Sequence, residues 1–469
     1  MRKCTTKENN GGQNYNAIVE GVIWKQLLIF FFPIMFGTFF QQLYTMIDAA
    51  IVGKFVGKEA LAAVGGTTGS LINLLVGFFV GLSSGASVIV SQYFGSKDQK
   101  GVKNSVHTAV AMGLAGGLIL TCIGQLLAPH ALKWIGTNEE IMDYALSYIR
   151  IYFFGIIPTA VYNVGAGILR AIGDSKRPLY YLIGACGINI VLDLLFVAVF
   201  HWGIEGAAYA TIISQLANAV FIYIYLIRSK EVYAVSPRRI KFHKREIKKM
   251  LLLGVPAGLQ SSMYTISNII IQAGINTFGT DSIAACTVFD KLDGIFWMIM
   301  SAFGIAVTTF VGQNFGAKKY DRIKKCVRVS LAMAMGTAIV LCLLCVVFSG
   351  LFFKIFTNDA DVIKIGVELV RFLMPMYFTY VCIEVISGAI RGAGDSVVPV
   401  IITCLGICVM RIIWILFVVP RWHELHVLML SYPITWTLTS TVFIIYYKSG
   451  GWLKRCTRKM FGEEGAYHG

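Results

Sequence analysis

The stretch SQYFGSKDQKGVKNSVHTAVAMG, residues 91–113, is similar to a second stretch that begins 221 positions later. This second stretch is GQNFGAKKYDRIKKCVRVSLAMA, residues 312–334, and the two share eight identical residues in 23. At the same offset LRAIGDSKRP (169–178) aligns with IRGAGDSVVP (390–399). Self-similarity at a fixed offset indicates an internal structural repeat. The sequence therefore predicts two copies of one unit, joined end to end.

The composition places both copies in a membrane. Of the 469 residues, 56% are hydrophobic and 14% are charged, whereas soluble domains are about 45–50% apolar. Apolar runs of about 18 residues or more can cross a bilayer as helices. We expect twelve such helices, near residues 24–52, 61–92, 104–128, 141–168, 178–200, 206–227, 249–277, 282–313, 327–350, 363–389, 398–419 and 427–447.

Lysine and arginine are divided unequally between the two sides of these helices. An even number of helices puts both termini on one side, and that side holds 29 of the 41 basic residues, against five on the other. Because cytoplasmic loops are enriched in Lys and Arg, we expect both termini to be cytoplasmic in a multi-pass protein of the cell membrane. This bias also explains the net charge of +16, so no nucleic-acid partner is predicted.

Six helices per copy is an even number, so both copies enter the membrane from one side. The predicted domains are a cytoplasmic tail at 1–20, an N-lobe at 21–227, a basic linker at 228–248, a C-lobe at 249–447 and a cytoplasmic tail at 448–469. We interpret the linker as solvated and in contact with anionic lipid. The predicted fold class is all-α, with twelve transmembrane helices in two lobes around a central cleft.

Several motifs together resemble the multidrug and toxic compound extrusion (MATE) transporters. They are the turns SQYFGSKD and GQNFGAKK, the turns RAIGDS and RGAGDS, and the stretch MIDAAIVGKFVGKEALAAVG, within a resemblance over about residues 20–447. The resemblance implies a V-shaped pair of six-helix lobes that exports organic, often cationic, compounds against an inward flow of sodium ions or protons. We expect a monomer surrounded by membrane lipids, with small-molecule substrates and no cofactor besides the coupling ion.

Acidic residues inside apolar helices are candidates for function, because each costs about 2.5–3.5 kcal/mol on insertion scales. In NIVLD, residues 189–193, Asn189 and Asp193 are four residues apart and project from one face of a helix. Thr211 lies as far after the following turn as Asp193 lies before it, and Asp48 is near the same end of the first helix. Their oxygen atoms suit an alkali cation, and a carboxylate pair can also share a proton.

The resemblance adds weight to this set. The coupling-ion site of MATE transporters uses an Asp of the first helix, an Asn-x-x-x-Asp of the fifth and a polar residue of the sixth, which match Asp48, Asn189, Asp193 and Thr211. The alternative is that Asp193 merely pairs with a lysine or arginine inside the lobe. At the repeat offset Asn189 becomes Met410 and Asp193 becomes Trp414, so the second half does not duplicate the site.

The second half instead carries three acids of its own in apolar helices: Asp290, Asp293 and Glu384. Either these acids line the cleft and attract a cationic substrate, or Lys291 and Arg411 neutralise them as buried pairs. Some MATE transporters place cation ligands in the carboxy-terminal lobe, which leaves a third interpretation open.

The residues of the two GDS turns have a structural interpretation. Asp or Ser just before a helix caps its first turn, and Pro suits that turn. We therefore expect Arg170, Asp174, Arg391 and Asp395 to shape turns and to take no part in chemistry.

Two other functions, a flippase and a channel, stay open from the residues alone, whereas the residues argue against an enzyme. A flippase of lipid-linked precursors with a similar duplicated design would need a more basic cleft, and a channel would pass ions without coupled substrate. A membrane-embedded enzyme would need clustered His or a Ser-His pair, whereas the seven histidines fall at loops or helix ends. Cys342 with Cys345, and Cys404 with Cys408, lack the further ligands of a metal site. We therefore predict a transporter without enzymatic activity.

Overall fold

The computed structural model of the protein describes residues 17–65, 67–134 and 136–462. Within these ranges every regular element is a helix and no strand occurs, which confirms the predicted all-α class. The chain divides into two compact units. Unit 1 comprises Met1–Gly258 with Gln313–Lys319, and unit 2 comprises Leu259–Gly312 with Tyr320–Gly469.

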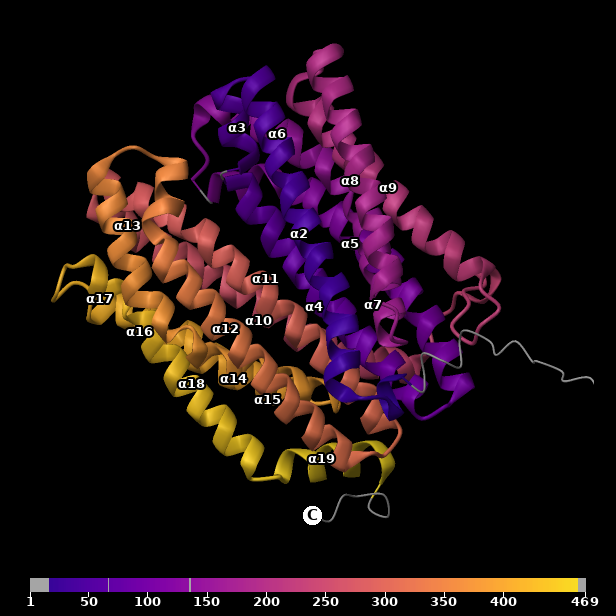
Figure 1. Ribbon diagram of the computed structural model, residues 1–469. Coiled ribbons are helices and arrows are strands. Elements are labelled where there is room, and N and C mark those ends of the chain that lie inside the picture. The colour runs from indigo at the N-terminus through magenta and orange to yellow at the C-terminus, as the bar shows by residue number, and fades with distance from the viewer. Residues whose placement is uncertain (1–16, 66, 135, 463–469) are drawn as a thin grey trace, which may run out of the picture. The chain divides into compact units, whose positions relative to one another are not determined.

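Unit 1 is built mainly from long helices that pack along one another, drawn from indigo to magenta in Figure 1. In chain order they are α2 (Ile23–Phe55), α3 (Lys58–Gly65), α4 (Thr67–Gly95), α5 (Gln99–Trp134), α6 (Glu139–Phe154), α7 (Ile156–Ala171), α8 (Lys176–Asp193), the π-helix η1 (Leu194–Val199), α9 (Gly203–Arg228), the short η2 (Pro237–Arg239) and the beginning of α10 (Lys244–Ile275). The most extensive packing joins α5 and α4 to α7, and α8 to α9 and α2.

Unit 2 contains the rest of α10 and the helices that follow it, except for Gln313–Lys319, and is drawn from salmon pink through orange to yellow in Figure 1. These are η3 (Asn276–Phe278), α11 (Thr280–Gly316), α12 (Tyr320–Phe356), α13 (Ala360–Leu373), η4 (Met374–Met376), α14 (Phe378–Gly392), α15 (Val397–Thr403), the π-helix η5 (Cys404–Val409), α16 (Met410–Phe417), α17 (Leu425–Met429), α18 (Ser431–Lys448) and α19 (Gly451–Phe461). Here α14 packs on α18, and α12 packs on α13 and α14.

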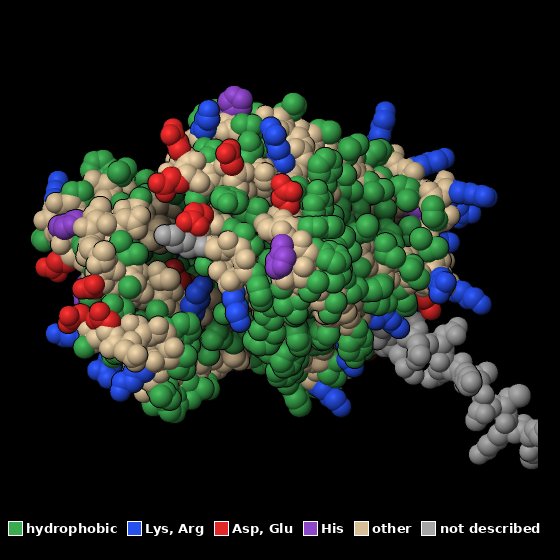
Figure 2. Space-filling view, turned by 90° about the horizontal axis from the view of Figure 1, so that it is seen from above, with side chains coloured by type: hydrophobic (Ala, Val, Ile, Leu, Met, Phe, Trp, Pro, Cys, Tyr) green, Lys and Arg blue, Asp and Glu red, His purple; other side chains and the backbone are tan. Residues whose placement is uncertain are grey.

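Eleven of the twelve expected spans have the length and apolar character to cross a membrane in the described ranges. Nine are single helical segments, and two are pairs bent by 46° (α6 with α7) and 48° (α13 with α14). The twelfth, α10, is a helix of 32 residues that is not among them, since residues such as Gln260, Ser261 and Ser262 interrupt its apolar run. Many large apolar side chains face outward, and Figure 2 shows broad areas of hydrophobic surface, as expected of a chain surrounded by lipid.

The internal repeat is visible in the helix starts. Asn138 and Asp359 are 221 residues apart, and each precedes the first member of a bent pair. The side chain of Asn138 accepts a hydrogen bond from the backbone N–H of Glu140, and that of Asp359 accepts from Asp361 and Val362. Each supplies an acceptor for backbone donors that the helix itself leaves unpaired.

Left-handed backbone recurs at equivalent positions as well. Lys97 and Lys318, which the repeat aligns, have φ of 59° and 57°, an uncommon conformation for residues with a side chain. Gly173 and Gly394 of the GDS turns have φ of 96° and 101°. The two copies therefore share turn geometry as well as sequence.

The two Gln-x-x-Gly turns lie against each other inside unit 1. A Cβ atom at Gly95 would overlap the backbone of Gln313, and one at Gly316 would overlap the backbone of Gln92. Gly95 is the repeat equivalent of Gly316, and Gln92 that of Gln313, so the contact is reciprocal. Only glycine lets two backbones approach this closely.

Candidate functional site

The four residues predicted to hold a coupling ion lie on three helices that pack against one another in unit 1. Asp48 is on α2, Asn189 and Asp193 are on α8, and Thr211 is on α9. The three helices contact each other pairwise. All four side chains are buried, with exposed fractions of 5%, 1%, 0% and 5%.

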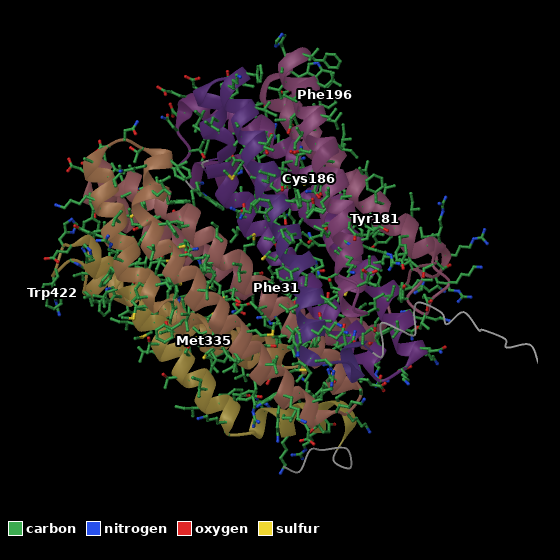
Figure 3. The ribbon with its side chains drawn as sticks, viewed as in Figure 1. Phe31, Tyr181, Cys186, Phe196, Met335 and Trp422 are labelled. Atoms are coloured by element: carbon green, nitrogen blue, oxygen red, sulfur yellow. The ribbon has the colours of Figure 1, made fainter. Side chains whose placement is uncertain are left out.

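A thiol fixes part of the packing between two of these helices. Cys186 lies on α8, one turn before Asn189, and its Sγ donates a hydrogen bond to the carbonyl of Phe40 on α2 at 3.5 Å. Figure 3 labels Cys186 among the side chains between the helices of unit 1. The polar residues on the same side of α8 therefore face the interior of the bundle.

All but one of the side-chain polar atoms of the four residues lack hydrogen-bond partners in the described part of the chain. This holds for Oδ1 of Asp48, both amide atoms of Asn189, both carboxylate oxygens of Asp193 and Oγ1 of Thr211. Nor does any described lysine or arginine form an ion pair with Asp48 or Asp193. An unsatisfied buried polar group costs about 1–3 kcal/mol, and more when charged. A bound cation or proton would remove much of this cost.

The two carboxylates influence each other. Asp193 interacts electrostatically with Asp48, and this interaction is repulsive when both are ionised. Among the described residues, no group of three or more His, Cys, Asp and Glu side chains gathers as a metal set. The candidate site therefore combines a pair of carboxylates with an amide and a hydroxyl on three helices that contact one another, and these groups are hard ligands suited to an alkali cation.

The backbone changes character at Asp193. This residue ends α8, and the next six residues form the π-helix η1. A π-helical turn inside a longer helix is frequently found at functional sites. The sequence gives no sign of it, because Leu194–Val199 is simply an apolar run.

Two tyrosines near the carboxylates were not singled out from the sequence. Tyr44 interacts electrostatically with Asp48, and its hydroxyl accepts a hydrogen bond from Nε2 of Gln215 at 3.3 Å. Tyr148, on α6, is close enough to interact with both Asp48 and Asp193. Tyr44 precedes Asp48 by one helical turn, a spacing that could have identified it. Nothing in the sequence connects Tyr148 to this site.

A polar stripe on α9 continues from Thr211. Ser214 and Asn218 follow at three and seven residues, a spacing that keeps them on one helix face, and they are 3% and 0% exposed. The hydroxyl of Ser214 donates to the carbonyl of Thr211 at 2.8 Å. The spacing of Ser214 and Asn218 from Thr211 in the sequence could have identified them as part of the same face.

In unit 2, Asp293 lies among aromatic side chains. It accepts hydrogen bonds from Nε1 of Trp297 at 2.7 Å and from the hydroxyl of Tyr377 at 2.6 Å. The ring of Trp297 is 4.5 Å from that of Tyr380, and Tyr377 is 5.0 Å from Trp436, measured between centroids. Asp293 is therefore a carboxylate held by aromatic donors.

Glu384 is held in a similar way, whereas Asp290 is not. The hydroxyl of Tyr380 donates to Glu384 at 3.0 Å. Gly304 of α11 leaves room for the carboxylate, since a Cβ there would overlap it. Asp290, one turn before Asp293, is exposed. The three acids are thus distributed along α11 and α14 with different surroundings.

The two basic residues predicted as possible partners interact electrostatically with these acids, Lys291 with Asp290 and Arg411 with Asp293, but form no ion pair with them. Arg411 is 2% exposed, and its guanidinium is 4.1 Å from the centroid of the Tyr432 ring. It interacts with Asp293 only at longer range. Within the described residues, no ion pair joins Lys291 or Arg411 to the acids on α11 and α14.

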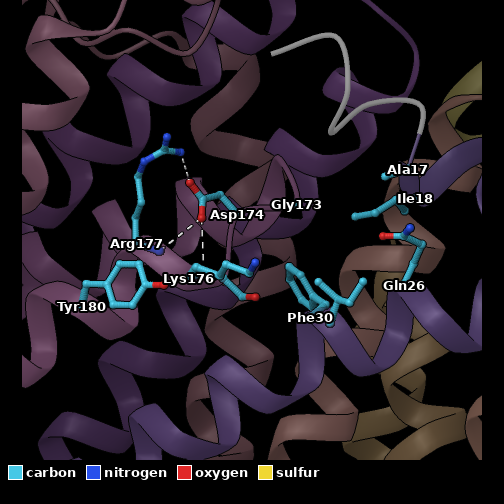
Figure 4. Close-up of a pocket in the computed structure, with 11 residues that line it drawn as sticks. Ala17, Ile18, Gln26, Phe30, Gly173, Asp174, Lys176, Arg177 and Tyr180 are labelled. Atoms are coloured by element: carbon cyan, nitrogen blue, oxygen red, sulfur yellow. Dashed lines mark hydrogen bonds and ion pairs between the residues drawn. The ribbon is translucent and has the colours of Figure 1, made fainter. Parts of the chain in front are cut away.

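The first GDS turn closes the start of α8. Oδ1 of Asp174 accepts hydrogen bonds from the backbone N–H groups of Lys176 and Arg177, both at 3.2 Å, and its carboxylate also pairs with the Arg177 guanidinium. Figure 4 shows this turn beside Phe30 of α2, where a pocket of about 300 Å³ is formed. These interactions are those of a helix cap.

The second GDS turn has a different partner. Oδ1 of Asp395 accepts from the backbone N–H of Val398 at 3.4 Å, and Oδ2 pairs with Arg455 of α19 at 2.9 Å. Arg170 and Arg391 occupy the last turns of α7 and α14.

This chain is similar in sequence and in fold to known proteins. The MatE family model matches residues 33–195 and again 256–416. The chain is 28% identical over 445 residues to the probable multidrug resistance protein YoeA of Bacillus subtilis, covering 93% of this chain and 96% of the relative. It is 23% identical over 353 residues to the multidrug export protein MepA of Staphylococcus aureus, covering 75% and 78%. A solved outward-facing multidrug resistance MATE family transporter of the MOP superfamily superposes with a TM-score of 0.86 at 22% identity, covering 95% and 98%.

Proposed function

The chain belongs to the MatE family, and we propose that it exports organic, often cationic, compounds in antiport with sodium ions or protons. One observation carries the proposal most directly: two buried carboxylates, Asp48 and Asp193, lie on the same packed helices as Asn189 and Thr211 and form no ion pair with the described residues. The names of relatives such as YoeA and MepA support the class of substrate.

The coupling step follows from the electrostatics of the two carboxylates. When both are ionised, Asp48 and Asp193 repel each other, and three of their four oxygens lack hydrogen-bond partners among the described residues. A cation brings its charge to both carboxylates, and Asn189 and Thr211 contribute neutral oxygens that complete its coordination. Since a ligand shifts a conformational equilibrium only by its different affinity for the two states, ion binding here can drive the change that releases substrate.

Aromatic donors in unit 2 support a substrate-facing role for the second set of acids. Organic cations are attracted to the faces of aromatic rings as well as to carboxylates. Trp297, Tyr377 and Tyr380 surround or contact Asp293 and Glu384, which gives both kinds of attraction in one region. We infer that these two acids favour cationic over neutral compounds.

The function is tested with purified protein in proteoliposomes. An imposed sodium gradient or, separately, a pH gradient should drive efflux of a fluorescent organic cation such as ethidium, and ethidium should in turn move the driving ion. Ion flux that is independent of ethidium would identify a channel, and failure of both gradients to drive export would refute antiport.

A further inference from the structure

The basic linker between α9 and α10 is fastened to α5 and does not lie free in solvent. The backbone N–H of Ser236 donates to Nε2 of His107 at 3.0 Å. Thr108 donates from its hydroxyl to the carbonyl of Lys241 at 3.4 Å, and this hydroxyl is 2.9 Å from Nδ1 of His243. Since His107 and Thr108 are buried residues of α5, the linker has a fixed path along that helix.

A second group of contacts holds the far end of the linker. Glu246, 5% exposed, accepts hydrogen bonds from the hydroxyl of Tyr93 at 3.1 Å and that of Ser105 at 3.4 Å. Lys249 donates to the same Tyr93 hydroxyl at 2.7 Å. These two groups of contacts therefore hold residues 236–249 at the surface of unit 1.

This path places the linker over an apolar groove of about 450 Å³. The groove is lined by Ala111, Leu114, Ala115, Leu118, Ile157, Ile240, Lys241 and Phe242. Ala111 and Ala115 are one helical turn apart and small, while Leu114 and Leu118 beside them are 41% and 56% exposed. The missing side-chain volume at the two alanines explains why α5 is hollowed here.

The surroundings of the groove identify what can enter it. From Ala109 to Leu127 α5 has no charged residue, and an exposed stretch of this kind in a transmembrane helix faces hydrocarbon. At the linker end the groove meets Lys241, which is exposed and forms no ion pair with any described residue. The site is thus apolar along its length and positively charged at one end.

We propose that this groove binds an anionic phospholipid, with an acyl chain along Leu114 and Leu118 and the headgroup phosphate at Lys241. The acyl chain of the lipid gains little free energy when it moves from the surrounding lipid tails into the groove, because these tails are as apolar as leucine. Selectivity must therefore come from the headgroup. Phe242, 55% exposed beside Lys241, covers the junction of the apolar and charged parts.

The test uses the full-length protein in detergent with a phosphatidylglycerol that carries a photoreactive group in its acyl chain, followed by peptide mapping. Labelling should concentrate on residues 111–118 and 240–242, and unlabelled phosphatidylglycerol should compete better than phosphatidylcholine. Lys241→Gln should weaken retention of phosphatidylglycerol about fivefold, as expected for one lysine near an anionic lipid. Lys230→Gln is the matched control, because Lys230 is an exposed linker residue outside the groove.

A second variant tests the groove itself. Ala115→Trp fills the hollow and should abolish labelling at residues 111–118 while leaving the charge at Lys241 unchanged. Equal competition by the two lipids, or equal effects of Lys241→Gln and Lys230→Gln, would overturn the proposal. Displacement of the lipid probe by a transported organic compound at its transport concentration would also overturn it, since the groove would then be a substrate site.

Discussion

Asp48 and Asp193 are the residues on which the coupling account depends. In our proposal both carboxylates serve one ion, so removing either should remove the same function. We expect Asp48→Asn and Asp193→Asn each to lower gradient-driven export by at least about tenfold, since interactions with a charged group are worth about 1.5–3 kcal/mol. The double variant should cost little more than either single one.

The comparison is made by initial export rates in proteoliposomes, with Asp143→Asn as a control at an exposed acid on α6. If the fold-losses in export rate of the two single variants multiply in the double variant, as they would for two independent sites, the shared-ion interpretation is wrong.

Glu384 allows a separate test of substrate charge. Glu384→Gln keeps the shape and the hydrogen bond from Tyr380 but removes the charge. We expect export of a cationic compound to fall roughly fivefold or more relative to a neutral one of similar size, because a charge pair 4 Å apart is worth about 1 kcal/mol even in water. Paired efflux assays measure this ratio, and an equal loss for both compounds would argue against a cation-attracting role.

At the scale of single residues, the sequence indicates candidates whose signal lies within one segment of the chain. Asn189 and Asp193 are recognisable as candidate site residues because one segment contains both their spacing and their apolar surroundings. Tyr148 and Gly304 are not, since their roles arise from contacts with helices far away in the chain. The aromatic donors to Asp293 were also missed, because tyrosine and tryptophan are ordinary residues in membrane helices.

Among the structural elements, the Gln-x-x-Gly turns offer the sharpest test of packing. Gly95→Ala places a methyl group against the backbone of Gln313, which cannot move aside as a flexible side chain would. We expect destabilisation of about 1–3 kcal/mol, as for other overpacked sites, seen as a lower melting temperature in detergent.

Gly336→Ala is the matched control, because Gly336 lies in α12 with open space around its Cβ position. It should be neutral or slightly stabilising, since alanine is the better helix former. Equal stability of both variants with the wild type would contradict the close contact at Gly95.

Helix positions followed from apolar runs, but helix shape did not. Both bent pairs break at nearly the same place in the repeat, yet Gly155 stands at one break and Tyr377 at the other, two residues after Pro375. No single sequence motif therefore predicts the bend in both pairs. The π-helices η1 and η5 occur in plain apolar sequence. Length and hydropathy predict a span, whereas its bends depend on packing.

For the whole molecule, the distribution of basic residues predicts which side of the membrane each loop occupies. A cysteine at Arg239 in the linker should react with an impermeant maleimide only in inside-out vesicles, and one at Ile355, which is 73% exposed, only in right-side-out vesicles. Native Cys456 should not interfere, because burial and the Asp395 carboxylate raise the pKa of its thiol to about 12 and the thiolate is the reactive form. The opposite labelling pattern would show that the predicted orientation in the membrane is wrong.

The duplication explains why the architecture was predictable while the sites were less so. Turn glycines and helix caps are shared by both copies, so each copy supports the assignment of the other. The residues of the candidate ion site are not shared, since Met410 and Trp414 occupy the positions of Asn189 and Asp193. Only contacts between helices could indicate the surroundings of each acid.

The most direct measurement compares the wild type with Asp193→Asn under the gradient that drives wild-type export, together with binding of the exported compound in the absence of any gradient. Our account predicts that export by the variant collapses while binding is largely retained, because the amide keeps the shape of the site but cannot hold a cation by charge. Normal gradient-driven export by Asp193→Asn under both sodium and proton gradients would contradict it.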